Sequence, residues 1–394
     1  MPAANDVVFL EGARTPIGSF LGGLSRVSAT QLGTIAAQGA ITRADIDPAV
    51  IDAIYFGNVI QSSKDAAYIA RHIGLDAGIP ESTPALTVNR ACGSGIEAVV
   101  QGAKSLMVGE SRVVLAGGAE NMSMTPYAMR GVRQGWKMIK SDVDDMLFSA
   151  LFDPKAGCSI GETVEHLAAE EGITRAAADA AAVRGQQRAA AAIAVGIFAE
   201  EIVPVTVGRG RRQRTVSADE SPRPDSTLAT LSALPGLFAA DGVITAGNSC
   251  GLNDAGAAIL MTTTAQAAAL GRTPIGRLVS WGTTGIAPRR MGMGPIAASQ
   301  QALDHAGLTL ADIDIIELND SFTVQHLAIG QAMGLDDAKV NTNGGAIALG
   351  HPMGATGTRL ILSALYTLRR TGARTALCTV CIGGGQGIAV VVSA

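Results

Sequence analysis

Cys92 lies in a segment whose residue types suit nucleophilic chemistry. It belongs to the run Asn-Arg-Ala-Cys-Gly-Ser-Gly (residues 89–95), directly before a stretch with helical periodicity. The partial positive charge at a helix N-terminus lowers the pKa of a nearby thiol, so we expect thiolate character at Cys92. From this segment alone, a small buried cysteine packed under a helix is an equal alternative.

His351 follows the glycine-rich residues 343–350 and also opens a helix-like segment. An imidazole, with an ordinary pKa near 6.5, exchanges protons at neutral pH and is a natural base for a thiol. A single histidine is more often structural. A functional role is favoured for this histidine, because the chain has only five and this one occupies the position that repeats Cys92 in the second half.

Two further segments carry candidate groups. Cys381 precedes three glycines, whose backbone N–H groups could face an oxyanion. Cys378 and Cys381 could instead form a redox pair, but that motif usually opens a helix, whereas a β-rich run precedes this one. No Lys-Ser/Thr pair follows the glycines, which argues against a phosphate loop.

Asn319 ends a strand-like run. Its amide there could hold a water molecule, donate to an oxyanion, or simply cap a turn.

An internal repeat indicates how these side chains are positioned. The run Ala-Asp-Ile-Asp occurs at residues 44–47 and again at 311–314, each time before a strand-like segment. His351 follows Cys92 by 259 residues, close to the offset of the other repeated segments. The sequence therefore predicts two similar α/β halves. In each half the segment after the chemical residue has apolar residues at helical spacing: Ile96, Val99, Val100, Ala103 and Leu106, then Leu360, Ile361, Ala364, Leu365 and Leu368.

The region between the repeats differs in character and predicts an inserted cap. It contains an alanine-rich helix near residues 175–198 and an arginine-rich loop at 209–214, for which a linker is an alternative interpretation. We expect an N-terminal half from residues 1–121 and 252–271. The cap then spans residues 122–251, and the C-terminal half spans 272–394.

Composition excludes several classes of protein. The net charge is −4, only 16% of residues are charged, and no long basic run occurs, so nucleic acid is not an expected partner. No stretch approaches the roughly 18–20 apolar residues of a membrane span. Neither a signal peptide nor a peroxisomal ending is expected. Five scattered cysteines favour a reducing compartment, so we expect a soluble cytoplasmic protein.

Three motifs together closely resemble the thiolase family: residues 89–95, the run Gly-His-Pro-Met-Gly-Ala-Thr-Gly at 350–357, and Cys-Ile-Gly-Gly-Gly-Gln-Gly at 381–387. The resemblance extends over essentially the whole chain. It implies an α/β thiolase fold, in which two βαβαβαββ-type halves form a five-layer α-β-α-β-α core. A loop domain inserted into the first half would bind coenzyme A (CoA).

The resemblance also implies catalytic roles. Cys92 would take the acyl group from an acyl-CoA, and His351 would activate its thiol. Cys381 would remove the α-proton of the incoming acetyl-CoA. His351 and a water held by Asn319 would stabilise the enolate, while the N–H groups of Cys92 and Gly383 would hold the tetrahedral intermediate. The reaction would need no metal and no redox cofactor, and family members are commonly homodimers or homotetramers.

The family's CoA-binding positions correspond less clearly to residues of this sequence than the catalytic positions do. Arg223 would meet a phosphate, although a solvated arginine is the alternative. Apolar contacts to pantetheine and the acyl group would come from Phe238, Met291 and Phe322, for which plain core packing is an equal alternative. Departures from the family's usual residues occur at Ser159, Ser249, Cys250 and Asp320. Either Cys250 or Ser249 would replace a hydroxyl that meets pantetheine.

The expected activity is an acetyl-CoA C-acyltransferase that performs thiolysis of 3-oxoacyl-CoA and the reverse condensation. A decarboxylating β-ketoacyl synthase is a related alternative, which would use two histidines, or histidine with asparagine, beside the cysteine. A non-catalytic acyl-CoA or lipid-binding protein is another. The acyl chain length, the direction in the cell and the choice between dimer and tetramer stay open.

Overall fold

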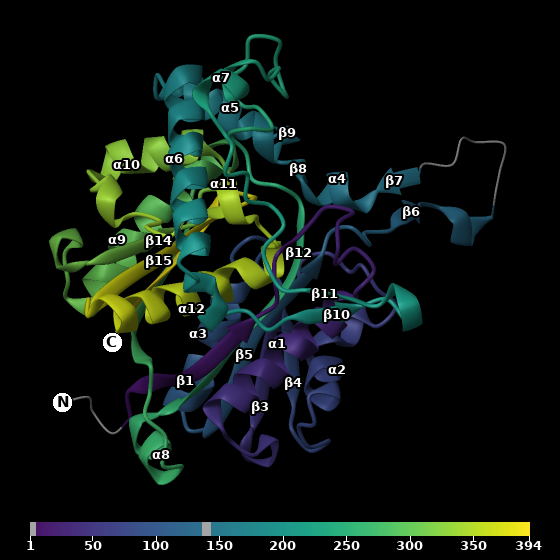
Figure 1. Cartoon of the computed structure of the whole chain (residues 1–394), viewed down its shortest axis with the longest axis vertical. Coiled ribbons are helices and arrows are strands. Elements are labelled where there is room, and N and C mark those ends of the chain that lie inside the picture. Colours follow the sequence, from purple (N-terminus) through teal and green to yellow (C-terminus); the bar gives the residue numbers. More distant parts are fainter. Residues whose placement is uncertain (1–4, 136–142) are drawn as a thin grey trace.

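The computed structural model describes residues 5–135 and 143–394, in which one mixed sheet runs through the molecule (Figure 1). Its strands follow the order β14-β15-β16-β13-β1-β12-β5-β3-β4, and the short β2 pairs with β12. The strands are β1 (Val7–Arg14), β2 (Gly18–Ser19), β3 (Ala53–Gly57), β4 (Ala85–Val88), β5 (Val113–Asn121), β12 (Asn253–Thr263), β13 (Gly276–Gly285), β14 (Ile315–Leu318), β15 (Thr375–Ile382) and β16 (Gln386–Ser393).

Helices cover both faces of each half of this sheet. In the N-terminal half α1 (Ala29–Ala44) and α2 (Ile69–Asp76) pack on the outer face, and α3 (Ser94–Met107) packs on the inner face. In the C-terminal half α9 (Gly294–Ala306) packs on the outer face and is contacted by α10 (Thr323–Met333). The helix α12 (Met353–Thr371) packs against α3 and against strands of both halves. These contacts give the expected five-layer α-β-α-β-α arrangement.

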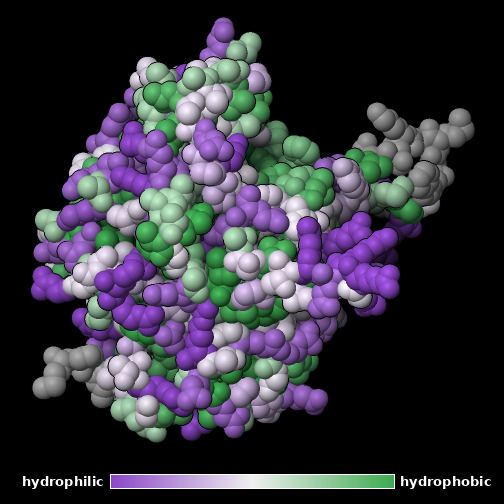
Figure 2. All heavy atoms as spheres, viewed as in Figure 1, coloured by the Kyte–Doolittle hydropathy of each residue, from purple (hydrophilic) through white to green (hydrophobic). Residues whose placement is uncertain are grey.

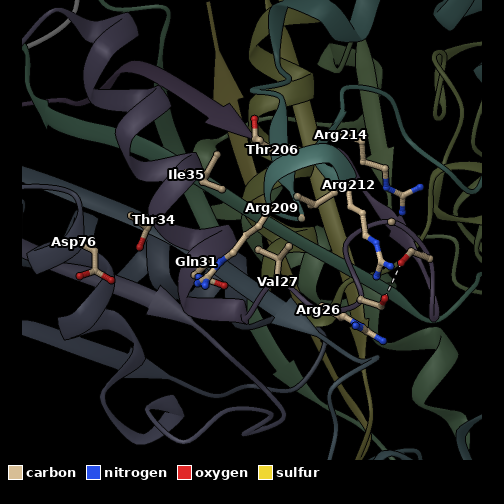
Figure 3. Close-up of a pocket in the computed structure, with 15 residues that line it drawn as sticks. Arg26, Val27, Gln31, Thr34, Ile35, Asp76, Thr206, Arg209, Arg212 and Arg214 are labelled. Carbon is tan, nitrogen blue, oxygen red and sulfur yellow. Dashed lines mark hydrogen bonds between the residues drawn. The ribbon is translucent and has the colours of Figure 1, made fainter.

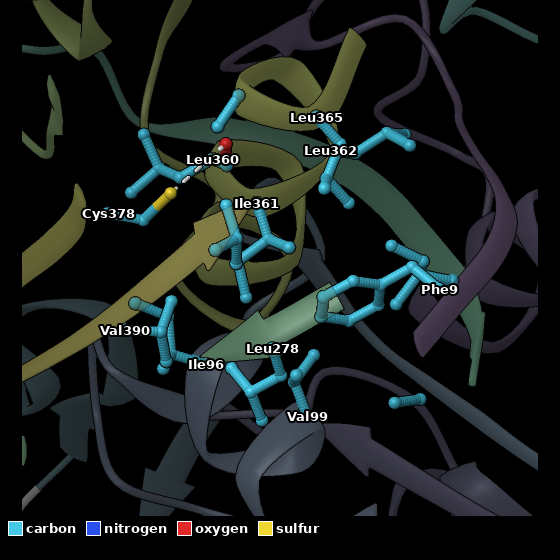
Figure 4. Packing of buried hydrophobic residues seen from close by; sticks show 14 of the residues in the cluster. Phe9, Ile96, Val99, Leu278, Leu360, Ile361, Leu362, Leu365, Cys378 and Val390 are labelled. Atoms are coloured by element: carbon cyan, nitrogen blue, oxygen red, sulfur yellow. Dashed lines mark hydrogen bonds between the residues drawn. The ribbon is translucent and has the colours of Figure 1, made fainter. Parts of the chain in front are cut away.

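The central layer is the most apolar part of the molecule. Every residue of α12 from Met353 to Leu368 is buried, because neighbouring elements surround this helix. Figure 4 shows side chains of α12 packing between Phe9 of β1, Leu278 of β13 and Ile96 of α3. The apolar positions expected on α3 and α12 all lie in this cluster. Fully burying each valine, leucine or isoleucine side chain of this cluster contributes roughly 1.5–3 kcal/mol.

The predicted repeat reappears as matched contacts in the two halves. Asp52 precedes β3 and accepts hydrogen bonds from the backbone N–H groups of Arg112 and Val113, at 2.7 and 3.1 Å. In the second half, Asp314 precedes β14 and accepts the equivalent bonds from residues 374 and 375, at 2.8 and 3.2 Å. The sheets of the two halves join where β1 pairs with β13.

The inserted region leaves the core after β5 and returns at β12. Its helices are α4 (Met146–Ala150), α5 (Ile160–Glu170), α6 (Arg175–Ala194) and α7 (Leu228–Ser232), and its strands are β6 (Tyr127–Met129), β7 (Val143–Asp145), β8 (Phe152–Asp153), β9 (Cys158–Ser159), β10 (Val205–Val207) and β11 (Arg214–Val216). The arginine-rich residues 209–213 form the turn of the β10–β11 hairpin and Arg214 opens β11, so the linker interpretation is wrong. Figure 2 shows this hairpin as a hydrophilic projection.

Two short helices lie outside the inserted region: α8 (Thr264–Ala269) follows β12, and α11 (Ala346–Leu349) precedes the His351 loop. Among the described residues, no helix is long and apolar enough to cross a membrane.

Candidate active site

One cavity of about 220 Å³ collects most of the predicted site residues. It lies where the loops that precede α3 and α12 meet the cap and the end of β15. Nine of the twelve predicted residues line it: Cys92, Ser159, Phe238, Cys250, Met291, Phe322, His351, Cys381 and Gly383. The rest of its wall is mainly apolar, with Met122, Phe148, Leu151, Ile160, Leu252 and Met353 among the contributors.

The central helices bring Cys92 and His351 to the same cavity. Each residue lies two positions before its helix, α3 or α12. The first turns of these helices touch through backbone, since a Cβ on Gly357 would lie 2.3 Å from the amide nitrogen of Ile96. The Oγ1 of Thr358 also donates to the Gly95 carbonyl at 3.1 Å. Helices in such close contact at their N-termini place the preceding loops side by side.

Hydrogen bonds select the tautomer of His351. Its Nδ1 lies 2.8 Å from Thr356 Oγ1, and the same hydroxyl donates to the Pro352 carbonyl at 2.9 Å. Because the only hydroxyl proton of Thr356 is used in that bond, Nδ1 must carry a proton and donate it to Oγ1. The unprotonated Nε2 then accepts from Asn319 Nδ2 at 3.5 Å. The geometry leaves Nε2 as the basic nitrogen of the site.

The backbone of the His351 loop is fixed as well. The His351 N–H donates to Asn253 Oδ1 at 2.9 Å. The preceding Gly350 has φ of 106°, a conformation that favours glycine, and a Cβ there would lie 2.5 Å from the Asn253 side chain. Burial and, to a lesser extent, the positive charge of Arg359 together lower the pKa of His351 to about 3, so the imidazole is neutral at physiological pH.

The expected thiolate character of Cys92 is wrong for the ligand-free protein. Burial raises the pKa of the Cys92 thiol to about 12, and the nearby Cys381 also disfavours the charged form. Hydrogen bonds from the backbone N–H groups of Gly383 and of Cys92 itself lower the pKa, but by less than burial raises it. The site therefore holds a neutral thiol beside a neutral imidazole. The two predicted oxyanion donors both point toward the reacting sulfur.

Cys381 lies on the cavity side of β15, and its Sγ lies 3.6 Å from Ser321 Oγ. Burial raises its thiol pKa, while contacts with Ser321 and Gln325 lower it. Cys378 lies on the opposite face of the same strand, where its thiol contacts the Leu360 carbonyl at 3.7 Å. Residues three apart on a strand point to opposite faces, so the two thiols cannot form a disulfide without backbone rearrangement.

Three predicted residues lie outside the cavity wall. Asn319 is fully buried beneath His351, which it contacts. Ser249 is buried and does not line the cavity, whereas its neighbour Cys250 does, so Cys250 is the residue that faces a ligand. Arg223 is exposed, and its guanidinium donates to the Ala246 carbonyl at 3.3 Å.

Comparisons with known proteins agree with this geometry. The model of the thiolase N-terminal domain matches residues 7–265, and that of the thiolase C-terminal domain matches residues 272–394. The chain belongs to the thiolase family. It is 44% identical to the beta-ketothiolase BktB of Cupriavidus necator, over 98% of each chain. It is 43% identical to the acetyl-CoA acetyltransferase of Escherichia coli, again over 98% of each. The crystal structure of human mitochondrial 3-ketoacyl-CoA thiolase in complex with CoA superposes with a TM-score of 0.96, at 42% identity, covering 100% of this chain and 99% of that one.

Sequence reasoning missed several residues that hold the thiolase site together. Thr356 is buried in the first turns of α12 and contacts His351, which precedes it by five residues. The only sequence signal for this role was a hydroxyl residue a short distance after the histidine. Asn253 begins β12, and the nine residues after it are also buried. A polar amide at the start of such a strand was the sequence signal for this residue. Ser321, beside Cys381, carried no separate signal in the sequence.

A second cavity, of about 690 Å³, lies between the β10–β11 hairpin and the start of α1. Figure 3 shows Arg212 pointing toward Arg26, Arg209 pointing toward Gln31, and Asp76 at the other end. This cavity shares no lining residue with the thiol cavity.

Proposed function

We propose that this thiolase-family protein is an acyl-CoA C-acyltransferase. It cleaves 3-oxoacyl-CoA with CoA and, in reverse, condenses acetyl-CoA with an acyl-CoA. The observation that supports this most strongly is that Cys92, His351 and Cys381 line one cavity. Two thiols and one neutral base suit a ping-pong reaction that passes through a thioester with the protein.

In the first half of the condensation, the Cys92 sulfur attacks the carbonyl carbon of an acyl-CoA. The thiol proton passes to Nε2 of His351, which the Thr356 contact leaves unprotonated. The negative charge on the tetrahedral oxygen meets the N–H groups of Cys92 and Gly383. The carbon–sulfur bond to CoA then breaks, CoA takes the proton from His351, and the acyl group stays on Cys92.

In the second half, Cys381 acts on the α-carbon of acetyl-CoA. The Cys381 thiol first passes its proton to Nε2 of His351, and its sulfur then removes an α-proton from acetyl-CoA. The N–H that His351 has gained at Nε2, together with Asn319, stabilises the developing enolate oxygen. The enolate carbon attacks the acyl carbon on Cys92, and that thioester breaks to return the Cys92 sulfur, which takes the proton from His351. Thiolysis is the same sequence in reverse. The groups named supply every proton transfer, so the reaction needs no metal and no redox cofactor.

The cavity accommodates the reacting end of the substrate. Its volume, about 220 Å³, is smaller than the roughly 300–1,000 Å³ usual for a drug-sized ligand. The acyl group and the thioester therefore lie inside, against Met291, Phe322 and Cys250. The nucleotide part of CoA lies outside, where the exposed Arg223 is available to a phosphate.

The two alternatives fit the site less well. A decarboxylating β-ketoacyl synthase would place two histidines, or a histidine with an asparagine, beside the cysteine, and the Cys381 thiol in the same cavity argues against it. Among the residues that line the cavity, His351 is the one histidine. A protein that only binds acyl-CoA would have no use for two thiols facing the same carbonyl position.

The test is a thiolysis assay with purified protein, CoA and 3-oxoacyl-CoA substrates of increasing chain length. Wild-type protein should cleave at least one substrate, and Cys92→Ser should abolish cleavage. Cys158→Ser is the matched control, because this buried cap cysteine does not line the cavity. Cleavage by Cys92→Ser at the wild-type rate would exclude the proposal. The chain-length profile also assigns the substrate preference that Cys250 and Ser159 leave open.

We also propose that the enzyme acts in the cytoplasm as a homodimer or homotetramer. All five cysteines are free, which suits a reducing compartment. The strand β4 forms an edge of the sheet, with Leu86 half exposed. Figure 2 shows hydrophobic residues around α4 and β8, where Phe148 and Phe152 are exposed. Light scattering after gel filtration should give the mass of a dimer or tetramer, and a monomer would contradict this part.

A further inference from the structure

Glu120 is a carboxylate inside an otherwise apolar strand. It is fully buried near the end of β5, and it shares a strand face with Val114 and Ala116. Those two residues belong to the central cluster, so the Glu120 side chain points toward the central helices. The mechanism above does not use it.

Four N–H groups converge on this carboxylate. Its Oε1 accepts from Asn58 Nδ2 and from the Ile60 N–H, both at 3.1 Å. Its Oε2 accepts from the Val59 N–H at 3.1 Å and from the Gly354 N–H at 2.9 Å. A carboxylate is an acceptor at both oxygens, so this arrangement fits the ionised form. Burial raises the pKa of Glu120 to about 7, and the bonds from the backbone N–H groups of Ile60, Gly354 and Val59 oppose that rise.

One of the four bonds fixes the His351 loop. Gly354 lies in the first turn of α12, three residues after His351. The first N–H groups of a helix have no partner within it, and the residue before α12, Pro352, provides no side-chain cap. Glu120 supplies that partner from the other half of the molecule. Its negative charge is also favourable at a helix N-terminus.

A second bond leads to the Cys92 loop. Val59, whose N–H is held by Glu120, accepts a hydrogen bond at its carbonyl from Asn89 Nδ2 at 3.1 Å. The Oδ1 of Asn89 accepts from the Ala91 N–H at 2.9 Å. Ala91, directly before the nucleophile, has φ of 43°, a left-handed conformation costing roughly 1–2 kcal/mol for a residue other than glycine. This chain of bonds holds that conformation.

We propose that Glu120 is a positioning residue, whose single carboxylate fixes the Cys92 loop and the His351 loop relative to one another. It contacts neither the substrate nor the reacting atoms. The inference rests on the proposed function for its effect on rate, while its effect on the two loops can be measured without any substrate.

The decisive variant is Glu120→Gln, which keeps the shape but replaces one acceptor oxygen with an NH2 group. That group would face two N–H donors, so one pair of bonds is lost. A shift of about 1 Å between reacting groups costs on the order of 100-fold in rate, so kcat should fall by about that factor. KM should stay within about threefold, because the substrate-lining residues are unchanged. Hydrogen exchange should accelerate in residues 89–92 and in residues 353–356.

Asp219→Asn is the matched control for a general loss of stability. Asp219 is also a buried carboxylate, bonded to Arg14 at 2.7 Å and to the Ile17 N–H at 2.8 Å, and it does not line the thiol cavity. This variant should lower the melting temperature without accelerating exchange in either loop and without changing kcat. A Glu120→Gln protein with wild-type kcat, or with faster exchange spread evenly over the chain, would overturn the proposal.

Asn89→Ala tests the same connection should Glu120→Gln fail to fold. Asn89 is exposed, so its loss leaves the core intact, but it breaks the link between Val59 and Ala91. Exchange should accelerate in residues 89–92 and stay unchanged in residues 353–356. Unchanged exchange in both segments would count against the proposal. If the wild-type protein has no thiolase activity, the proposed function fails, yet these exchange results still decide the role of Glu120.

Discussion

The Nδ1 of His351 lies 2.8 Å from the hydroxyl of Thr356, which donates its own proton to the Pro352 carbonyl. This pair of contacts keeps the other imidazole nitrogen unprotonated and directed toward Asn319. A base in the wrong tautomer would present a proton to the Cys92 thiol instead of a lone pair. The tautomer fixed by Thr356 is therefore required for His351 to accept the thiol proton.

Removing that hydroxyl should slow the reaction without unfolding the protein. Thr356→Val keeps the side-chain volume, and we expect a loss of about 10- to 100-fold in kcat because the imidazole loses its fixed tautomer and orientation. Steady-state thiolysis kinetics measure this. Thr367→Val removes a buried hydroxyl of the same helix, far from His351, that accepts from Asn343 and Arg370, and it should leave kcat within about threefold. Equal losses in both variants would contradict the role of Thr356.

The pKa values of the site predict how Cys92 reacts with alkylating agents. With the thiol pKa raised to about 12 and that of His351 lowered to about 3, both groups are neutral over the working range of pH. Only the thiolate reacts, so the rate of alkylation by iodoacetamide should rise continuously between about pH 6 and about pH 9. Mass spectrometry of the peptide with Cys92 follows the reaction. A plateau above about pH 7 would show that the thiol is already ionised.

The contact between Ser321 and Cys381 predicts an effect on one half-reaction only. The hydroxyl lies 3.6 Å from the sulfur and lowers its pKa, so Ser321→Ala should make deprotonation of Cys381 harder. Condensation should slow by about tenfold, while exchange of labelled CoA into acetyl-CoA, which uses Cys92 and His351 but not Cys381, should continue. Thr379→Val, on the same strand and bonded to the Ile388 carbonyl, is the control. Equal slowing of exchange and condensation would assign Ser321 a different role.

The buried pair of Glu317 and Arg359 predicts how stability changes with pH. Burial raises the pKa of Glu317 to about 8, despite the charge of Arg359 at 3.6 Å. Between about pH 4.5 and about pH 8 the folded protein holds a proton that the unfolded chain has released, so stability falls as pH rises. Glu317→Gln should reduce this fall by about 4 kcal/mol, measured by urea unfolding at about pH 5 and about pH 9. Glu120 acts in the same direction, so part of the slope remains. An unchanged slope would contradict the pKa of Glu317.

Much of the fold followed from local pattern. The repeated Ala-Asp-Ile-Asp runs precede β3 and β14, and the periodic apolar residues lie on α3 and α12, because packing of the central helices demands apolar residues on every side. The motifs around Cys92, His351 and Cys381 meet in one cavity, because the repeat places their helices and strands in equivalent positions.

Other features depended on contacts between distant segments. Thr356 and Asn253 acquire roles only once α12 and β12 meet the His351 loop. The raised pKa of Cys92 reflects burial by the whole surrounding structure, which a local argument from the helix N-terminus omits. The arginine-rich run has no sequence signal that separates a hairpin turn from a linker. Arg223 lies on the surface, and only a bound nucleotide would define its partner.

The central claim is that Cys92 carries the acyl group. Its most direct test is mass spectrometry of the Cys381→Ser variant after incubation with acetyl-CoA, since this variant can accept the acyl group but cannot form the carbon–carbon bond. We predict that the peptide with Cys92 gains the mass of one acetyl group, in step with CoA release. An unmodified Cys92, or an acetyl group on Cys250 that persists in Cys92→Ser, would contradict the account.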